Sequence, residues 1–195
     1  MIIKIKFKLL LRIKYLVHLI LFWIYRFDSW HISPIESREY CIDVISYVNS
    51  KIQINSCVME IGCGLGETIN AINCENKMGY DLSKNVIFAA KLRHFFNRNI
   101  FHIGSFDSLV GKKIEFLIAL NFLHDFDSAT VSQWLKDLNI SNEIDFIIVD
   151  EILDTKYQNN HSFLELLPSN FTLIDSPFKE YRYNRLIKIF KNNKA

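Results

Sequence analysis

Residues 58–68 read Val-Met-Glu-Ile-Gly-Cys-Gly-Leu-Gly-Glu-Thr, an apolar run that ends in three glycines at alternate positions. Glycine lacks a Cβ atom, so this loop can turn sharply and bring backbone N–H groups against a ligand at the start of a following helix. The spacing disagrees with two phosphate-binding loops. A P-loop would continue with Gly-Lys-Ser or Gly-Lys-Thr, and the dinucleotide fingerprint would place its third glycine where Glu67 stands. The stretch therefore predicts a strand, a ligand-binding loop and a helix.

Short apolar runs alternate with helical segments from Cys57 onward, which is the pattern of a parallel sheet with crossover helices. The predicted strands cover residues 57–61, 77–81, 99–103, 115–120 and 144–150, and the predicted helices cover 67–74, 84–96 and 128–138. Beyond them, the runs 171–174 and 185–190 predict a closing hairpin at one sheet edge. The fold class is thus α/β: a Rossmann-like, mostly parallel sheet with helices on both faces, a C-terminal antiparallel edge hairpin and a preceding amphipathic helix.

Three segments follow from this pattern. Residues 1–27 form a basic, apolar N-terminal segment, and residues 57–195 form the sheet domain. Residues 28–56 connect the two as a linker and a cap helix. That helix is predicted near residues 37–49, with Ile42, Ile45 and Val48 on one face toward the sheet.

The spacing Glu60-x-Gly62-x-Gly64-x-Gly66 resembles the first motif of class I S-adenosylmethionine-dependent methyltransferases, a resemblance that covers about residues 57–190. It implies S-adenosyl-L-methionine as the cofactor, with the Glu60 carboxylate near its cationic methionine end. Asp81 ends the second predicted strand, where a carboxylate can accept hydrogen bonds from both ribose hydroxyls or can cap the next helix. The cofactor contacts that the resemblance implies are Glu60, Gly62, Gly64, Gly66, Asp81, Leu82, Ser105, Phe106 and Asn121.

The third predicted strand ends in Gly-Ser-Phe-Asp at residues 104–107. The family often has an acidic residue here, beside an apolar neighbour that holds the adenine. This chain departs from that pattern, because Ser105 stands in the acidic place. On the resemblance, Phe106 stacks on the adenine while Ser105 or Asp107 reaches its amine; an ordinary turn with Phe106 in the core is the alternative.

The fourth predicted strand runs into Asn121, where the family brings acceptor and cofactor together. The Asn-Pro-Pro-Tyr box of methylases that act on amide or adenine nitrogens is absent, because Phe122 and Leu123 replace both prolines. His124 is a candidate general base for a hydroxyl acceptor, or else a structural histidine. Residues 30–40 are a lid over the acceptor or a plain linker, and as a lid they offer His31, Arg38 and Tyr40 as acceptor contacts.

The net charge of +2 hides a strong asymmetry, because residues 1–27 hold six lysines and arginines and no acid, which leaves a net −4 on the remainder. The body therefore lacks the basic footprint of a nucleic-acid-binding protein. The apolar run Tyr15–Tyr25 is too short to span a bilayer, and no small-residue cleavage site follows it. We expect a helix that lies on an anionic membrane surface or packs on protein, either its own domain or a second subunit, so an oligomer stays open.

The four cysteines at 41, 57, 63 and 74 form no Cys-x-x-Cys pair, which argues against a zinc site or a disulfide framework and fits a reducing cytoplasm. Together with the basic N-terminal segment, this predicts a cytoplasmic protein attached peripherally to the inner face of the membrane. We predict no metal, since Asn121 stands where a metal site beside Asp150 and Glu151 would need an acid. The sequence thus predicts a methyltransferase for a small or lipid-borne acceptor, such as a saccharide hydroxyl. The alternatives are a non-catalytic, cofactor-binding adaptor at a membrane and a nicotinamide-dependent oxidoreductase.

Overall fold

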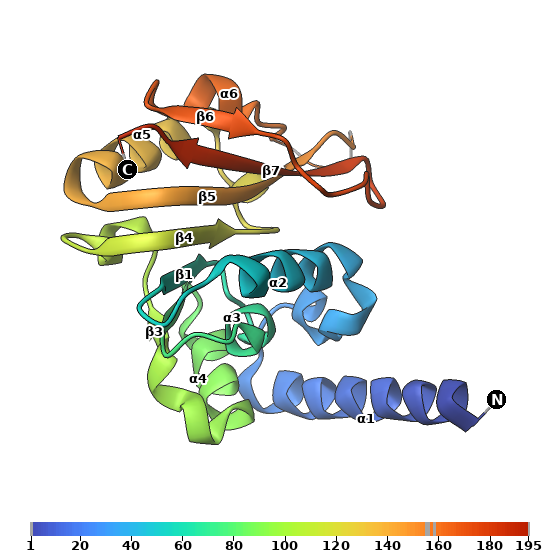
Figure 1. The fold of residues 1–195 in the computed structure, drawn as a ribbon. Coiled ribbons are helices and arrows are strands. Elements are labelled where there is room, and N and C mark those ends of the chain that lie inside the picture. Colours follow the sequence, from blue (N-terminus) through green and yellow to red (C-terminus); the bar gives the residue numbers. More distant parts are fainter. Residues whose placement is uncertain (1, 155–156, 158, 195) are drawn as a thin grey trace.

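The computed structural model describes residues 2–154, 157 and 159–194, with side chains from residue 8 onward. Within these residues the chain forms one seven-stranded sheet in the order β3-β2-β1-β4-β5-β7-β6 (Figure 1). Its strands are β1 (Cys57–Ile61), β2 (Asn76–Asp81), β3 (Phe101–Ile103), β4 (Lys113–Ala119), β5 (Glu143–Ile152), β6 (Phe171–Ile174) and β7 (Arg185–Asn192).

The sheet is parallel from β3 to β5, and β7 enters antiparallel between β5 and β6. This arrangement confirms the predicted mostly parallel sheet with an antiparallel C-terminal hairpin. The third strand is shorter than predicted, because a 3₁₀ helix, η3 (Phe95–Ile100), takes up the residues just before it. The fifth strand is longer than predicted and continues to Ile152, since β7 pairs with it to that residue.

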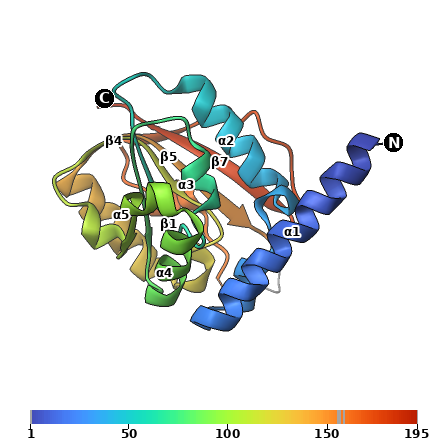
Figure 2. The ribbon, with the colours of Figure 1, turned by 90° about the horizontal axis from the view of Figure 1, so that it is seen from below.

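Helices cover both faces of the sheet (Figures 1 and 2). They are α2 (Glu39–Lys51), α3 (Glu67–Ala71), α4 (Lys84–Arg93), α5 (Ser128–Ser141) and α6 (Phe163–Leu166). Alternate residues of β1 show the division: Met59 packs in the core with α5, and Val58 packs in the core with α2, α3 and α4. A parallel strand covered on both faces must be apolar on both sides, which explains the continuous apolar runs in the sequence.

Three predicted helices need correction. In α2 the fully covered side chains are Cys41, Val44 and Val48, whereas Ile42 is 38% exposed and Ile45 is only partly buried. The predicted face was therefore right at Val48, partly right at Ile45 and wrong at Ile42, because a buried cysteine carries the 3–4 spacing of a helix as well as an isoleucine does. The third helix ends at Ala71 and the fourth at Arg93, both short of the predicted 74 and 96.

Helix α1 (Ile2–Tyr25) runs along one side of the domain and packs one face on it (Figure 2). Leu21 and the following Phe27 lie in a small core with Leu65 after β1 and with Val86 and Ala89 of α4. Of the two alternatives for this segment, packing on its own domain is therefore realised along one face. Among the described residues, no helix is long and apolar enough to span a membrane.

Candidate cofactor and acceptor site

The loop after β1 depends on glycine for two reasons. Gly62, Gly64 and Gly66 have φ angles of +72°, +54° and +73°, a left-handed conformation that favours glycine. A Cβ atom on Gly66 would also lie 2.1 Å from the ring of Phe101, and one on Gly62 would lie 2.5 Å from Cβ of Phe122. The loop is thus held in a conformation, and under side chains, that leave no room for a residue larger than glycine.

Glu60 lies at the end of β1 and is 3% exposed. One carboxylate oxygen, Oε2, accepts a hydrogen bond from the Ile69 N–H of α3 at 3.0 Å. Burial raises the pKa of Glu60 to about 8, although the Ile69 hydrogen bond and the charge of Arg38 both lower it. The carboxyl group is therefore largely protonated at pH 7, and a cationic ligand group beside it would favour its charged form.

Asp81 ends β2 and ties the glycine loop to the next helix. Its Oδ2 accepts from the Gly64 N–H at 3.0 Å and its Oδ1 from the Ser83 N–H at 2.9 Å. Ser83 in turn caps α4, since its Oγ accepts from the Val86 N–H. Each carboxylate oxygen of Asp81 keeps a second lone pair, so these contacts leave acceptors for a ribose. Ribose binding stays a prediction, and Leu82 beside Asp81 is half exposed.

The predicted lid covers the glycine loop. A Cβ atom on Gly64 would lie 2.8 Å from Nδ1 of His31, so the imidazole rests on the loop backbone. Burial, with a smaller contribution from Arg38, lowers the pKa of His31 to about 4 and keeps it neutral. The pocket beneath this lid is lined by Trp30, His31, Arg38, Tyr40, Cys41, Glu60, Gly62, Cys63, Gly64, Thr68, Leu120 and Asn121. The structure therefore brings the predicted lid residues together with Glu60, Gly62, Gly64 and Asn121.

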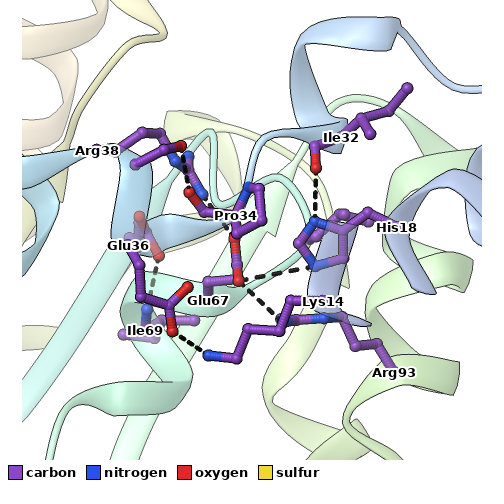
Figure 3. Close-up of polar contacts among 12 residues, drawn as sticks. Lys14, His18, Ile32, Pro34, Glu36, Arg38, Glu67, Ile69 and Arg93 are labelled. Atoms are coloured by element: carbon purple, nitrogen blue, oxygen red, sulfur yellow. Dashed lines mark hydrogen bonds and ion pairs between the residues drawn. The ribbon is translucent and has the colours of Figure 1, made fainter. Parts of the chain in front are cut away.

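Glu67 joins the lid, the loop and α1, and sequence reasoning missed this role (Figure 3). Its Oε2 accepts from Arg38 at 2.8 Å, and its Oε1 accepts from Arg93 of α4 at 2.9 Å. The fully buried His18 of α1 places Nε2 at 3.7 Å from the same Oε1. In the sequence, Glu67 is notable only as an acid where the dinucleotide fingerprint would have its third glycine. That observation singles out the residue but does not predict its partners.

Ser105 and Phe106 occupy different environments after β3. Ser105 is 5% exposed, and its Oγ has no hydrogen-bond partner among the described residues. A buried hydroxyl of this kind is stabilised when a ligand group pairs with it. Phe106 is 4% exposed and stacks on Trp134 of α5 at 5.5 Å between ring centroids, within the core. An adenine contact remains a prediction for both residues.

A buried polar cluster lies where β4 and β5 end. Asn121, with φ of +55°, donates its backbone N–H to Oδ1 of Asp150 at 2.9 Å. Its side-chain Oδ1 accepts from Nη2 of Arg185 at 2.7 Å. Arg185 also pairs with Asp150 and places its guanidinium 4.3 Å from the centroid of the Tyr40 ring. Arg185 thus fixes two residues that line the pocket, and nothing in the local sequence pointed to it.

The candidate base His124 lies apart from these residues. Its ring packs edge-on against Tyr157 at 4.7 Å, and its Nε2 is 3.5 Å from Asp125 Oδ1. Burial lowers the pKa of His124, which keeps a neutral imidazole at pH 7. The pocket lining does not include it, so its catalytic role stays a prediction. Across the described part of the chain, no group of three or more histidine, cysteine or acidic side chains could hold a metal ion.

Comparison with solved structures places this geometry in a known fold. Magnesium protoporphyrin IX methyltransferase from Synechocystis PCC 6803, with bound S-adenosylmethionine, matches at a TM-score of 0.61 and 15% identity over 80% of this chain and 78% of its own. The N-methyltransferase NodS from Bradyrhizobium japonicum WM9 matches at 0.65 and 13% identity over 80% and 96%. A TehB-like methyltransferase from Corynebacterium glutamicum matches at 0.60 and 13% identity over 76% and 86%.

These matches show that the chain has the fold of class I S-adenosylmethionine-dependent methyltransferases, as the glycine motif predicted. Comparisons with protein-family models and with curated proteins found no match. At 13 to 15% identity the likeness concerns the fold. The activity must therefore be argued from the site itself.

Proposed function

We propose that this protein is an S-adenosylmethionine-dependent methyltransferase. The observation that carries the proposal is the joint placement of the buried Glu60, the three left-handed glycines and Asp81 at the carboxyl ends of neighbouring strands. In open α/β sheets this is the edge at which ligands bind. The unpartnered Ser105 hydroxyl favours a ligand with polar groups, and a cationic group beside the buried Glu60 would stabilise the charged form of its carboxyl.

The residues present fit the cofactor. Glu60 would hold the cationic methionine end, the backbone of residues 62–66 would lie against the ligand, and Asp81 would accept from the ribose. Bound there, the cofactor supplies an activated methyl group on a sulfonium. Such a transfer needs alignment and exclusion of water above all, so the task of the protein is positioning. The lid with His31 resting on Gly64 supplies a cover of that kind.

For the acceptor we propose a small or lipid-borne molecule such as a saccharide hydroxyl. The support is that Arg38, Tyr40 and Asn121 give the narrow pocket beneath the lid a polar lining. A buried arginine, Arg185, holds Tyr40 and Asn121 in place. Screening cell extracts and lipid-linked glycans for label transferred from methyl-labelled S-adenosylmethionine would identify the acceptor. Cofactor binding with no transfer to any fraction would favour a non-catalytic adaptor.

Calorimetry tests the cofactor itself. We expect S-adenosylmethionine or S-adenosylhomocysteine to bind, and NAD and NADP not to bind; tight binding of a nicotinamide cofactor would contradict the proposal. Gly64→Ala should abolish binding, because its Cβ atom meets His31 and fills the loop. Gly111→Ala is the matched control, since Gly111 has a φ of +73° and no atom within 4 Å of the added Cβ. Both variants strain the backbone alike, and only the first lies at the site.

The pKa of Glu60 gives a second test. Because the free carboxyl has a pKa of about 8, an ammonium group bound beside it should lower that pKa and release a proton at pH 7. The binding enthalpy should therefore depend on the ionisation enthalpy of the buffer. Glu60→Gln should weaken binding and remove this buffer dependence. A wild-type enthalpy that is equal in phosphate and Tris would place the cationic group elsewhere.

A further inference from the structure

Two segments far apart in the sequence contain lysine and arginine but no acid. Residues 1–27 hold six basic residues, and residues 82–106 hold four, Lys84, Lys91, Arg93 and Arg98. The rest of the chain holds 13 basic and 21 acidic residues. Residues 181–194 hold a further five basic residues and no acid, and they include β7 rather than either of these two segments. Of the two segments, the sequence alone suggested a membrane role only for the first.

The fold places these two segments side by side. Helix α1 contacts α4, and the two share the small core of Leu21, Phe27, Val86 and Ala89. In Figure 1, α1 and the end of α4 form the lower border of the molecule. We call the exposed side of α1 together with residues 84–98 the basic face.

Large apolar side chains are exposed on both parts of the basic face. On α1 they follow one helical stripe on the side away from the domain: Leu9, Leu10, Ile13, Leu16, Val17, Ile20, Trp23 and Ile24, each between 41 and 60% exposed. Past α4, Phe95 is 57% exposed and Phe96 is 98% exposed, beside Phe88 and Leu92. A helix stripe and an aromatic corner of this size favour an apolar partner.

Cations accompany the aromatic rings on this face. The guanidinium of Arg26 lies 4.8 Å from the centroid of the Trp23 ring, and that of Arg98 lies 5.2 Å from the centroid of Phe95. Lys84 lies 5.5 Å from the Phe88 ring. Aromatic rings with lysine or arginine beside them are typical of surfaces that enter the headgroup layer of a bilayer, where the ring is buried and the charge stays among phosphates. The cores of protein interfaces are instead depleted in lysine.

From this charge complementarity we propose that the basic face docks on an anionic membrane, with Phe95 and Phe96 as an insertion point separate from α1. The occupant is the phospholipid surface itself. Attraction of the basic residues to anionic headgroups brings the face to the membrane, and the α1 stripe and the two phenylalanines hold it there by burial of apolar area. The side chains of Lys4 and Lys6 lie outside those described, and the proposal does not depend on their placement.

The test is co-sedimentation of the full chain with vesicles of phosphatidylcholine, with and without phosphatidylglycerol. We expect binding only when phosphatidylglycerol is present, and partial loss of binding when salt is added, because salt screens the charges and leaves apolar insertion intact. Phe95→Ser with Phe96→Ser should lower the vesicle partition coefficient about tenfold, since two exposed rings lose their insertion. Arg98→Glu should lower it further on anionic vesicles.

The matched control is Ile54→Ser with Ile140→Ser, because these side chains are 95 and 83% exposed on other parts of the molecule. The control should bind vesicles like the wild type. Wild-type binding by the Phe95/Phe96 variant would overturn the second insertion point, and equal binding to neutral vesicles would overturn the choice of anionic lipid. A dimer that dissociates on the same substitutions, without vesicle binding, would make a second copy the partner. Cofactor calorimetry is independent of all these outcomes.

Discussion

Helices α1 and α2 pack on the same domain but bury different kinds of face. Helix α2 buries Cys41, Val44 and Val48 against the sheet, and most of its exposed residues are polar. Helix α1 buries His18, pairs Lys14 with Glu36, and turns its apolar stripe outward. An amphipathic pattern predicts that the two faces of a helix differ. Which face packs on the domain depends on the domain residues that the helix contacts. In α1 the buried face is mixed: Lys14 and His18 face Glu36 and Glu67, and Leu21 packs in the small apolar core with Phe27.

The largest expected effect separates the two helices directly. Val44→Asp in α2 should lower the free energy of unfolding by about 4 kcal/mol or prevent folding, because it buries a charge at a position that is 0% exposed. Ile20→Asp in α1 should change it by less than about 0.5 kcal/mol, because that side chain is 51% exposed. Urea unfolding followed by circular dichroism measures both. Equal losses would contradict the outward orientation of the α1 stripe.

Removing the acid that joins the lid to α4 should have the next largest effect. Glu67→Gln leaves Arg38 and Arg93 without their carboxylate, and we expect a loss of about 3 kcal/mol. Glu143→Gln is the control, since that side chain is 80% exposed and pairs with Lys113 at 4.0 Å; it should cost less than about 1 kcal/mol. Equal losses for the two variants would show that the ion pairs of Glu67 contribute no more than an exposed pair.

Acid should loosen α1 before α2. Burial lowers the pKa of His18, and that of His94 to about 4. As the pH falls below 6.5, these histidines therefore bind protons more readily in the unfolded chain than in the folded chain, and the folded chain loses stability. Each histidine then costs about 1.4 kcal/mol of stability per pH unit, down to its folded pKa. Hydrogen-exchange protection factors, corrected for intrinsic rates, should fall more for α1 than for α2 between pH 7 and pH 5. Equal declines would remove His18 from the explanation.

The sequence predicted those parts of the protein that depend on neighbouring residues. The glycine spacing after Glu60 and the alternating apolar runs were sufficient for the strand–loop–helix unit and for the sheet. The polar supports were missed, because Glu67 and Arg185 meet partners that lie 26 to 64 residues away. The orientation of α1 could not be predicted either, since its charge pattern suits an anionic membrane surface and the acids Glu36 and Glu67 alike.

The insertion of β7 between β5 and β6 imposes an order on the folding of the chain during synthesis. Strand β6 is made before β7 and pairs with no other strand of the described chain, so it waits for residues 185–192 to emerge. Until then β5 presents an open edge beside a sheet that already holds the glycine loop and Asp81, and an open edge can pair with another chain. A message cut short before codon 185 would therefore yield a polypeptide with every predicted cofactor contact and a strong tendency to aggregate.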